Sequence, residues 1–144
     1  MDNEGTVLSL GALELTKLEA VVELMYLAAY ADGEVVAEER DVFAAHVAGV
    51  TNGVLSRAAM TSMLAAIEKA LASSSREQRF DSIRRRLGDA RTREASLRIA
   101  IHVLYADKFI DPREAAWVLR AAKALEIPEE DATRMLAEGA ASQS

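Results

Sequence analysis

Two short segments of the chain carry acidic side chains at the same spacing. YADGEVVAEE at residues 30–39 and YADKFIDPRE at residues 105–114 share the pattern Asp-x-x-apolar-x-x-x-Glu, 75 residues apart. Carboxylate oxygens are the ligands that Ca²⁺ and Mg²⁺ prefer in proteins, so the doubled pattern raises the hypothesis of a divalent-cation site. The first and last acids of the two segments are Asp32, Glu39, Asp107 and Glu114.

Helix capping is the alternative role for these acids. Asp111 followed three residues later by Glu114 is a capping box. Acids in the first turn of a helix are also stabilising, because the N-terminal end of the helix dipole is positive. Capping explains the second segment, but the first has Val36 where the second has Asp111. Asp32 and Asp107 fall where a helix is expected to end, and a negative charge is unfavourable there. A compensating cation and an N–H group of the turn both remain open as partners.

Other site chemistries are less well supported. The chain has no cysteine, which excludes thiolate metal sites, disulfides and cysteine nucleophiles. Neither histidine belongs to a Glu-x-x-His motif, because Phe43 and Ile99 precede His46 and His102 by three residues. The acidic segments lack the alternating oxygens of an EF-hand loop, and no Gly-rich phosphate loop occurs. A metal-dependent hydrolase would need a nucleophile or base that is not evident, so we expect a protein that is not an enzyme.

The elements that would position these acids are helices. Apolar residues recur at intervals of three and four, no segment alternates as a strand would, and the chain has only two prolines. We predict an all-α fold, a compact bundle of about seven helices in one domain over residues 1–144, with a core at about 13–138 and tails at 1–11 and 139–144. The expected helices cover about 13–31, 37–48, 56–71, 75–87, 92–106, 112–124 and 128–138.

The spacing of 75 residues also relates the helices beside the two acidic segments. It matches Val42 with Trp117 and Val50 with Leu125, so we expect two pseudo-repeated helix-turn-helix halves. Val35 and Ile110, the apolar residues inside the two turns, are expected to be buried anchors. In the second helix, we expect one buried stripe of Val42, Phe43, Val47 and Val50.

Charge is unevenly distributed. The net charge of −6 argues against a general nucleic-acid binder, but residues 76–98 hold eight arginines against four acids. We expect Phe80, Ile83 and Leu87 to face the core, with Arg84 and Arg85 in solvent. No apolar run is long enough to span a membrane, and the acidic start lacks the basic region of a signal peptide, so we expect a cytoplasmic protein.

The segments AYADGEVVAEER and LRIAIHVLYADKFIDPREAAWVLRAAKALEI resemble the TerB family of bacterial tellurite-resistance proteins, a domain also found at the front of some membrane-tethered J-domain co-chaperones. The likeness covers about residues 13–138. It implies a small helical bundle whose turn acids bind a divalent cation, calcium in the best-known case. It also implies action with other tellurite-resistance proteins in a stress-response complex near the membrane.

The resemblance implies a set of metal ligands and a ranking of the two turns. The implied ligands are Asp32, Glu39, Asp107 and Glu114, with Glu34, Glu38 and Asp111 in second rank. Three positions depart from the family pattern, namely Val36, Lys108 and Arg113. Because Lys108 places a positive charge beside the second turn, the first turn is the stronger candidate.

Two functions follow as hypotheses. One is a TerB-like stress-response module that binds Ca²⁺ or Mg²⁺ and docks partner proteins. The other is an interaction module whose turn acids are structural, with the Arg-rich helix contacting an acidic protein, an anionic lipid or RNA.

Overall fold

The computed structural model describes residues 14–29, 37–51, 53–105 and 115–142. This part of the chain contains seven α-helices and no strand, which confirms the predicted all-α bundle. The helices are α2 (Leu15–Ala29), α3 (Ala37–Val50), α4 (Arg57–Ser73), α5 (Arg76–Leu87), α6 (Ala90–Tyr105), α7 (Ala115–Ala124) and α8 (Glu129–Ser142).

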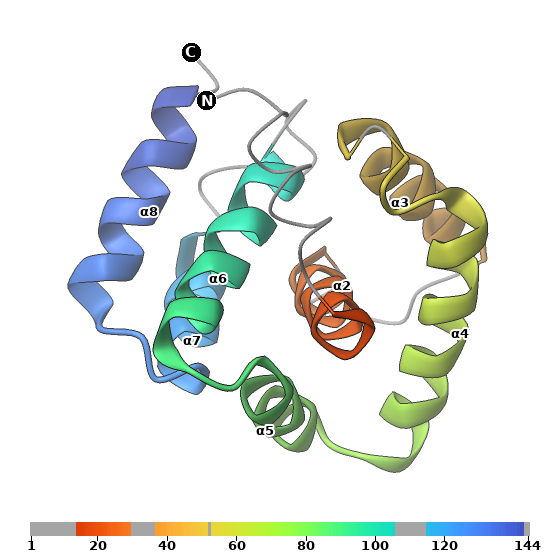
Figure 1. Ribbon diagram of the computed structural model, residues 1–144, viewed down its shortest axis with the longest axis horizontal. Helices are drawn as coiled ribbons and strands as arrows, with labels where there is room; N and C mark the ends of the chain where they lie inside the picture. Colours follow the sequence, from red (N-terminus) through yellow and green to blue (C-terminus); the bar gives the residue numbers. More distant parts are fainter. Residues whose placement is uncertain (1–13, 30–36, 52, 106–114, 143–144) are drawn as a thin grey trace.

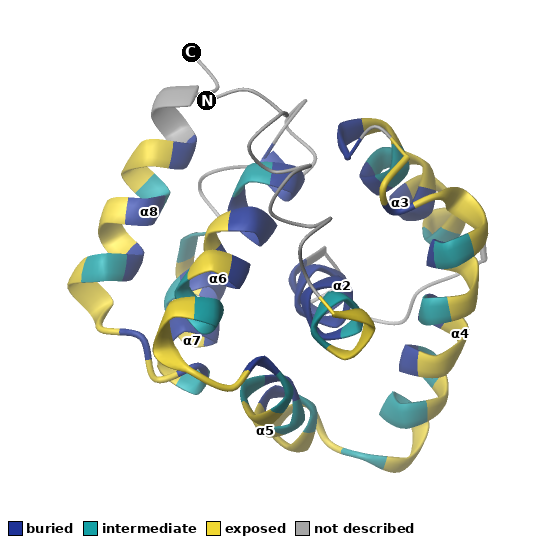
Figure 2. Cartoon of the chain, in the orientation of Figure 1, coloured by how far each residue is buried: buried dark blue, intermediate teal, exposed yellow. Residues whose placement is uncertain are grey.

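Helix α2 is the centre of the bundle. Figure 1 shows it seen almost along its axis, with α3 and α4 on one side, α5 below, and α6, α7 and α8 on the other side. Every residue from Ala20 to Ala28 is buried, as the dark blue ribbon in Figure 2 shows. A helix that is covered on all sides must be apolar all round. The exception is Glu23, which is only 1% exposed.

The repeat in the sequence corresponds to a repeat in the helices. Under the spacing of 75 residues, α2 matches α6 and α3 matches α7. Helix α3 contacts α6, and α7 contacts α2, so each half packs part of its second helix against the first helix of the other half. Val50 and Leu125 are buried at matching positions, as the repeat predicts.

The match between Val42 and Trp117 does not extend to their burial. Val42 is 60% exposed, whereas Trp117 is 8% exposed. The physical reason is that α7 is covered by α5 as well as α8, while α3 has α4 and α6 as its main neighbours. The predicted stripe on α3 therefore holds for Phe43, Val47 and Val50 but is wrong for Val42.

Helix starts follow the local signals in the sequence. The backbone N–H of Ala59 donates to the Ser56 hydroxyl at 3.2 Å at the start of α4. Ser75 and Gln78 form a capping box at the start of α5, with hydrogen bonds of 2.8 and 3.1 Å. Gly88 ends α5 with a positive φ of 78°, a conformation that glycine adopts without a Cβ clash.

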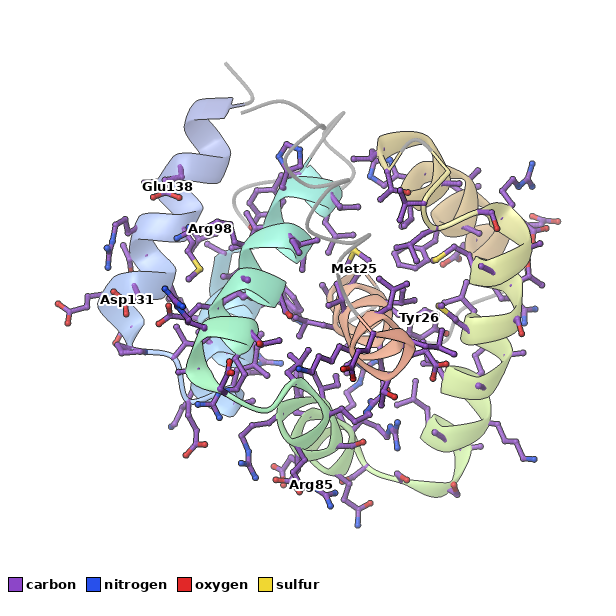
Figure 3. All side chains as sticks on the ribbon, in the orientation of Figure 1. Met25, Tyr26, Arg85, Arg98, Asp131 and Glu138 are labelled. Atoms are coloured by element: carbon purple, nitrogen blue, oxygen red, sulfur yellow. The ribbon has the colours of Figure 1, made fainter. Side chains whose placement is uncertain are left out.

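The last helix is longer than the sequence suggests. Residues 139–144 were expected to be a tail, but α8 continues to Ser142. Gly139 is buried against α6, where an added Cβ would lie 2.7 Å from Cγ2 of Ile101. Arg98 of α6 and Glu138 of α8 form an ion pair at 3.7 Å beside this contact (Figure 3). Close packing against α6 thus explains why α8 extends beyond residue 138, where we expected it to end.

Candidate functional site

Only two of the predicted metal ligands fall in the described part of the chain. Glu38 and Glu39 are exposed in the first turn of α3. Within residues 14–29, 37–51, 53–105 and 115–142, no group of three or more acids and histidines is placed to hold a metal ion. The remaining predicted ligands, Asp32, Glu34, Asp107, Asp111 and Glu114, lie outside the described residues, as do the predicted anchors Val35 and Ile110.

The helices that flank the first acidic segment are joined through one carboxylate of α4. The hydroxyl of Tyr26, in the last turn of α2, donates to Oε2 of Glu68 at 3.3 Å. The guanidinium of Arg40, in the first turn of α3, donates to Oε1 of Glu68 at 2.6 Å. Tyr26 also packs edge-on against Phe43 of α3, with ring centroids 6.0 Å apart. Glu68 therefore fixes the end of one flanking helix relative to the start of the next.

The end of α6, which precedes the second acidic segment, is tied to α3. Nε2 of His46 lies 2.7 Å from the carbonyl oxygen of Val103. A carbonyl can only accept, so Nε2 carries the proton and donates. This bond joins α3 of one half to α6 of the other. No motif around His46 in the sequence identifies this bond.

Two arginines of the Arg-rich segment at residues 76–98 bind a carboxylate that is buried in the core. The guanidinium of Arg79 donates to both oxygens of the buried Glu23, at 2.6 and 2.8 Å. Arg86 donates to the same carboxylate. The hydrogen bond to Glu23 raises the pKa of Arg79 above its ordinary value. These two arginines hold α5 against α2, so they are unavailable to a partner.

The prediction that Arg84 and Arg85 lie in solvent is confirmed for Arg85 but wrong for Arg84. Arg85 is exposed on the outer face of α5 (Figure 3), with its Nε 3.1 Å from Asp81. Arg84 is half-buried and pairs with Asp81 at 2.6 Å and with Glu126 at 3.5 Å. The hydrogen bond from Arg84 lowers the pKa of Asp81. The predicted inward residues of α5 are all buried: Phe80, Ile83 and Leu87.

The fold and the doubled acidic segments define a class of small, all-helical modules built from two helix-turn-helix halves. The family model described as "Tellurite resistance protein TerB" matches residues 17–137, which is most of the chain. The chain therefore belongs to the TerB family, as the resemblance predicted. No curated protein and no solved structure matches it. Within the described residues, no helix is long and apolar enough to cross a membrane.

Proposed function

We propose that this chain is a non-enzymatic TerB-type module that binds Ca²⁺ or Mg²⁺ through turn carboxylates and docks partner proteins in a stress response. The observation that carries this proposal is the family match, which spans both acidic segments together with their flanking helices. Hard cations favour oxygen ligands, and the chain offers no thiolate that would favour a softer metal.

Asp32 and Glu39 are the proposed principal ligands, with Asp107 and Glu114 as a second, weaker pair. Glu39 is exposed at the start of α3. The Glu68 bridge supports the proposal because it fixes the spacing of the two helices that flank the first acidic segment. A fixed spacing reduces the ordering cost of binding. Glu34, Glu38 and Asp111 are the second-rank ligands.

Melting temperature measured against cation concentration tests the proposal. A cation that binds only the folded chain stabilises it by about 2.7 kcal/mol at a hundredfold excess over the dissociation constant. Asp32→Asn combined with Glu39→Gln should remove most of this response, because the shape is kept and the charge is lost. Glu129→Gln combined with Glu130→Gln, two exposed acids of α8, removes the same charge and should leave the response intact. A parent protein that does not respond to millimolar Ca²⁺ or Mg²⁺ would exclude the cation role.

An interaction module with purely structural turn acids is the second candidate. The capping pattern of Asp111 and Glu114 and the exposed Arg85 favour it. Under this alternative, the Arg-rich helix contacts an acidic protein, an anionic lipid or RNA, and cations do not change the melting temperature. For both candidates the proposed setting is the cytoplasm, with other tellurite-resistance proteins as partners and the membrane reached through them.

A further inference from the structure

A groove lies between α5 and α7. It has a volume of about 600 Å³. Its apolar lining comes from Phe80 of α5 and Trp117 of α7, which are 9% and 8% exposed. The walls extend over about 10 Å along α7, given a rise of 1.5 Å per residue from Trp117 to Ala124. This length accommodates about three residues of an extended chain.

The rim of the groove is cationic. Arg120 and Lys123 are exposed on the α7 wall, and neither has an ion-pair partner in the described part of the chain. Arg76 is exposed on the α5 wall. Of the two acids in the lining, Asp81 is already paired with Arg84 and Arg85, which leaves Glu77 as the opposing charge. The rim therefore favours an anionic ligand even though the whole chain has a net charge of −6.

We propose that this groove docks a short acidic peptide segment of a partner protein, with one apolar side chain inserted toward Phe80 and Trp117 and flanking carboxylates on Arg120 and Lys123. The inference deepens the proposed function, on which it rests, by naming the chemistry of the docked partner. It is independent of the cation site, because none of the groove residues is a proposed ligand.

The geometry disfavours the other polyanions. Stacking of a nucleic-acid base needs an exposed ring face, and both aromatic rings of the groove are more than nine-tenths covered. An anionic membrane presents a broad charged surface, which the excess acids of the chain would repel. A short peptide can place two carboxylates beside Arg120 and Lys123. Its extended backbone also fits the groove, which is long enough for about three residues.

The groove contains its own reporter, because Trp117 is the only tryptophan of the chain. The probes are peptides of sequence Gly-Ser-Glu-Glu-X-Glu-Glu-Ser-Gly, with X as Leu, Phe or Met. Their controls carry Lys for Glu, or Ser for X. Binding is followed by Trp117 fluorescence and by the chemical shift of its indole N–H. We expect at least one acidic peptide to saturate both signals and its Lys and Ser controls to bind more weakly.

A pair of matched variants assigns the binding to the groove. Arg120→Glu combined with Lys123→Glu should lower the affinity for the acidic peptide by about tenfold or more, since two ion pairs at the rim become repulsive contacts. Arg57→Glu combined with Lys69→Glu makes the same charge change on exposed positions of α4 and should bind like the parent.

Three results would overturn the proposal. One is that no acidic peptide of the panel binds more tightly than its lysine control. Another is that both double variants bind the peptide equally. The third is that anionic phosphatidylglycerol vesicles or single-stranded oligouridine act through Arg120 and Lys123 while the acidic peptides do not. Calcium-dependent melting of the same variants separates this failure from failure of the cation role, because the groove variants should keep the parent's response.

Discussion

The guanidinium of Arg79 in α5 holds both carboxylate oxygens of Glu23 in α2, at 2.6 and 2.8 Å. Glu23 is the one acid in the central buried stretch of α2, and Arg86 donates to it as well. The arginines of this segment therefore differ in their surroundings. Arg79 and Arg86 join α5 to α2 through Glu23, while Arg85 lies at the surface.

Removing Glu23 should destabilise the protein severely. Glu23→Ala leaves two largely covered guanidinium groups without their carboxylate, and breaking a buried pair costs about 3–5 kcal/mol. Arg85→Ala removes an exposed arginine of the same helix and should change the free energy of unfolding by less than about 0.5 kcal/mol. Urea denaturation of both variants measures the difference. Equal effects would mean that the pair with Glu23 contributes little to stability.

Two glycines in helices should respond in opposite directions to alanine. Gly49 of α3 has open space around its Cα, so Gly49→Ala should stabilise by about 0.5–1 kcal/mol. At Gly139 a new Cβ would lie 2.7 Å from Ile101, and crowding a packed core costs about 1–3 kcal/mol. Gly139→Ala should therefore be less stable than the parent in thermal denaturation. If Gly139→Ala stabilised the chain as much as Gly49→Ala, the close packing of α8 on α6 would be wrong.

Much of the fold could be predicted from the sequence because its determinants are local. Apolar spacing, the caps at Ser56 and Ser75, and Gly88 each act over a few residues. The partners of Glu23 could not be found this way, since Arg79 lies 56 residues further along the chain. The different burial of Val42 and Trp117 has the same cause, because it depends on which helices cover α3 and α7.

The candidate site is predicted less completely than the fold. The repeat identified the acids and their flanking helices, but it could not identify the bridges that hold those helices, Glu68 and His46. Both bridges join residues far apart in sequence, and neither follows a motif. Arg120 and Lys123 were also missed, because only their position beside Trp117 distinguishes them from other surface cations.

Glu126 offers a test of backbone strain against surface charge. It lies two residues after the end of α7 and has a positive φ of 60°, while its carboxylate lies 3.5 Å from both Arg84 and Arg93. Glu126→Ala removes the ion pairs and keeps the strained conformation, whereas Glu126→Gly removes both. The glycine variant should be more stable than the alanine variant by about 1 kcal/mol in urea denaturation. Equal stabilities would show that the left-handed conformation carries no penalty here.

Asp89 predicts a specific dependence of stability on pH. Its carboxylate accepts a 2.8 Å hydrogen bond from the backbone N–H of Thr92 at the start of α6, and this bond lowers its pKa. A lowered folded-state pKa means that the contribution is present above the unfolded value of about 3.9 and is lost as the pH falls through the folded value. The melting temperature of Asp89→Asn should therefore lie below that of the parent at neutral pH and approach it in acid. A constant difference at all pH values would contradict this assignment.

The most direct test of the cation role is isothermal titration calorimetry of the parent with Ca²⁺ and with Mg²⁺. We predict a saturable heat from two sites of unequal affinity. Asp32→Asn combined with Glu39→Gln should remove the tighter site, and Asp107→Asn combined with Glu114→Gln should remove only the weaker one. The absence of saturable heat with either cation at millimolar concentration, or unchanged binding in the first of these variants, would contradict the proposal that the first turn binds a cation.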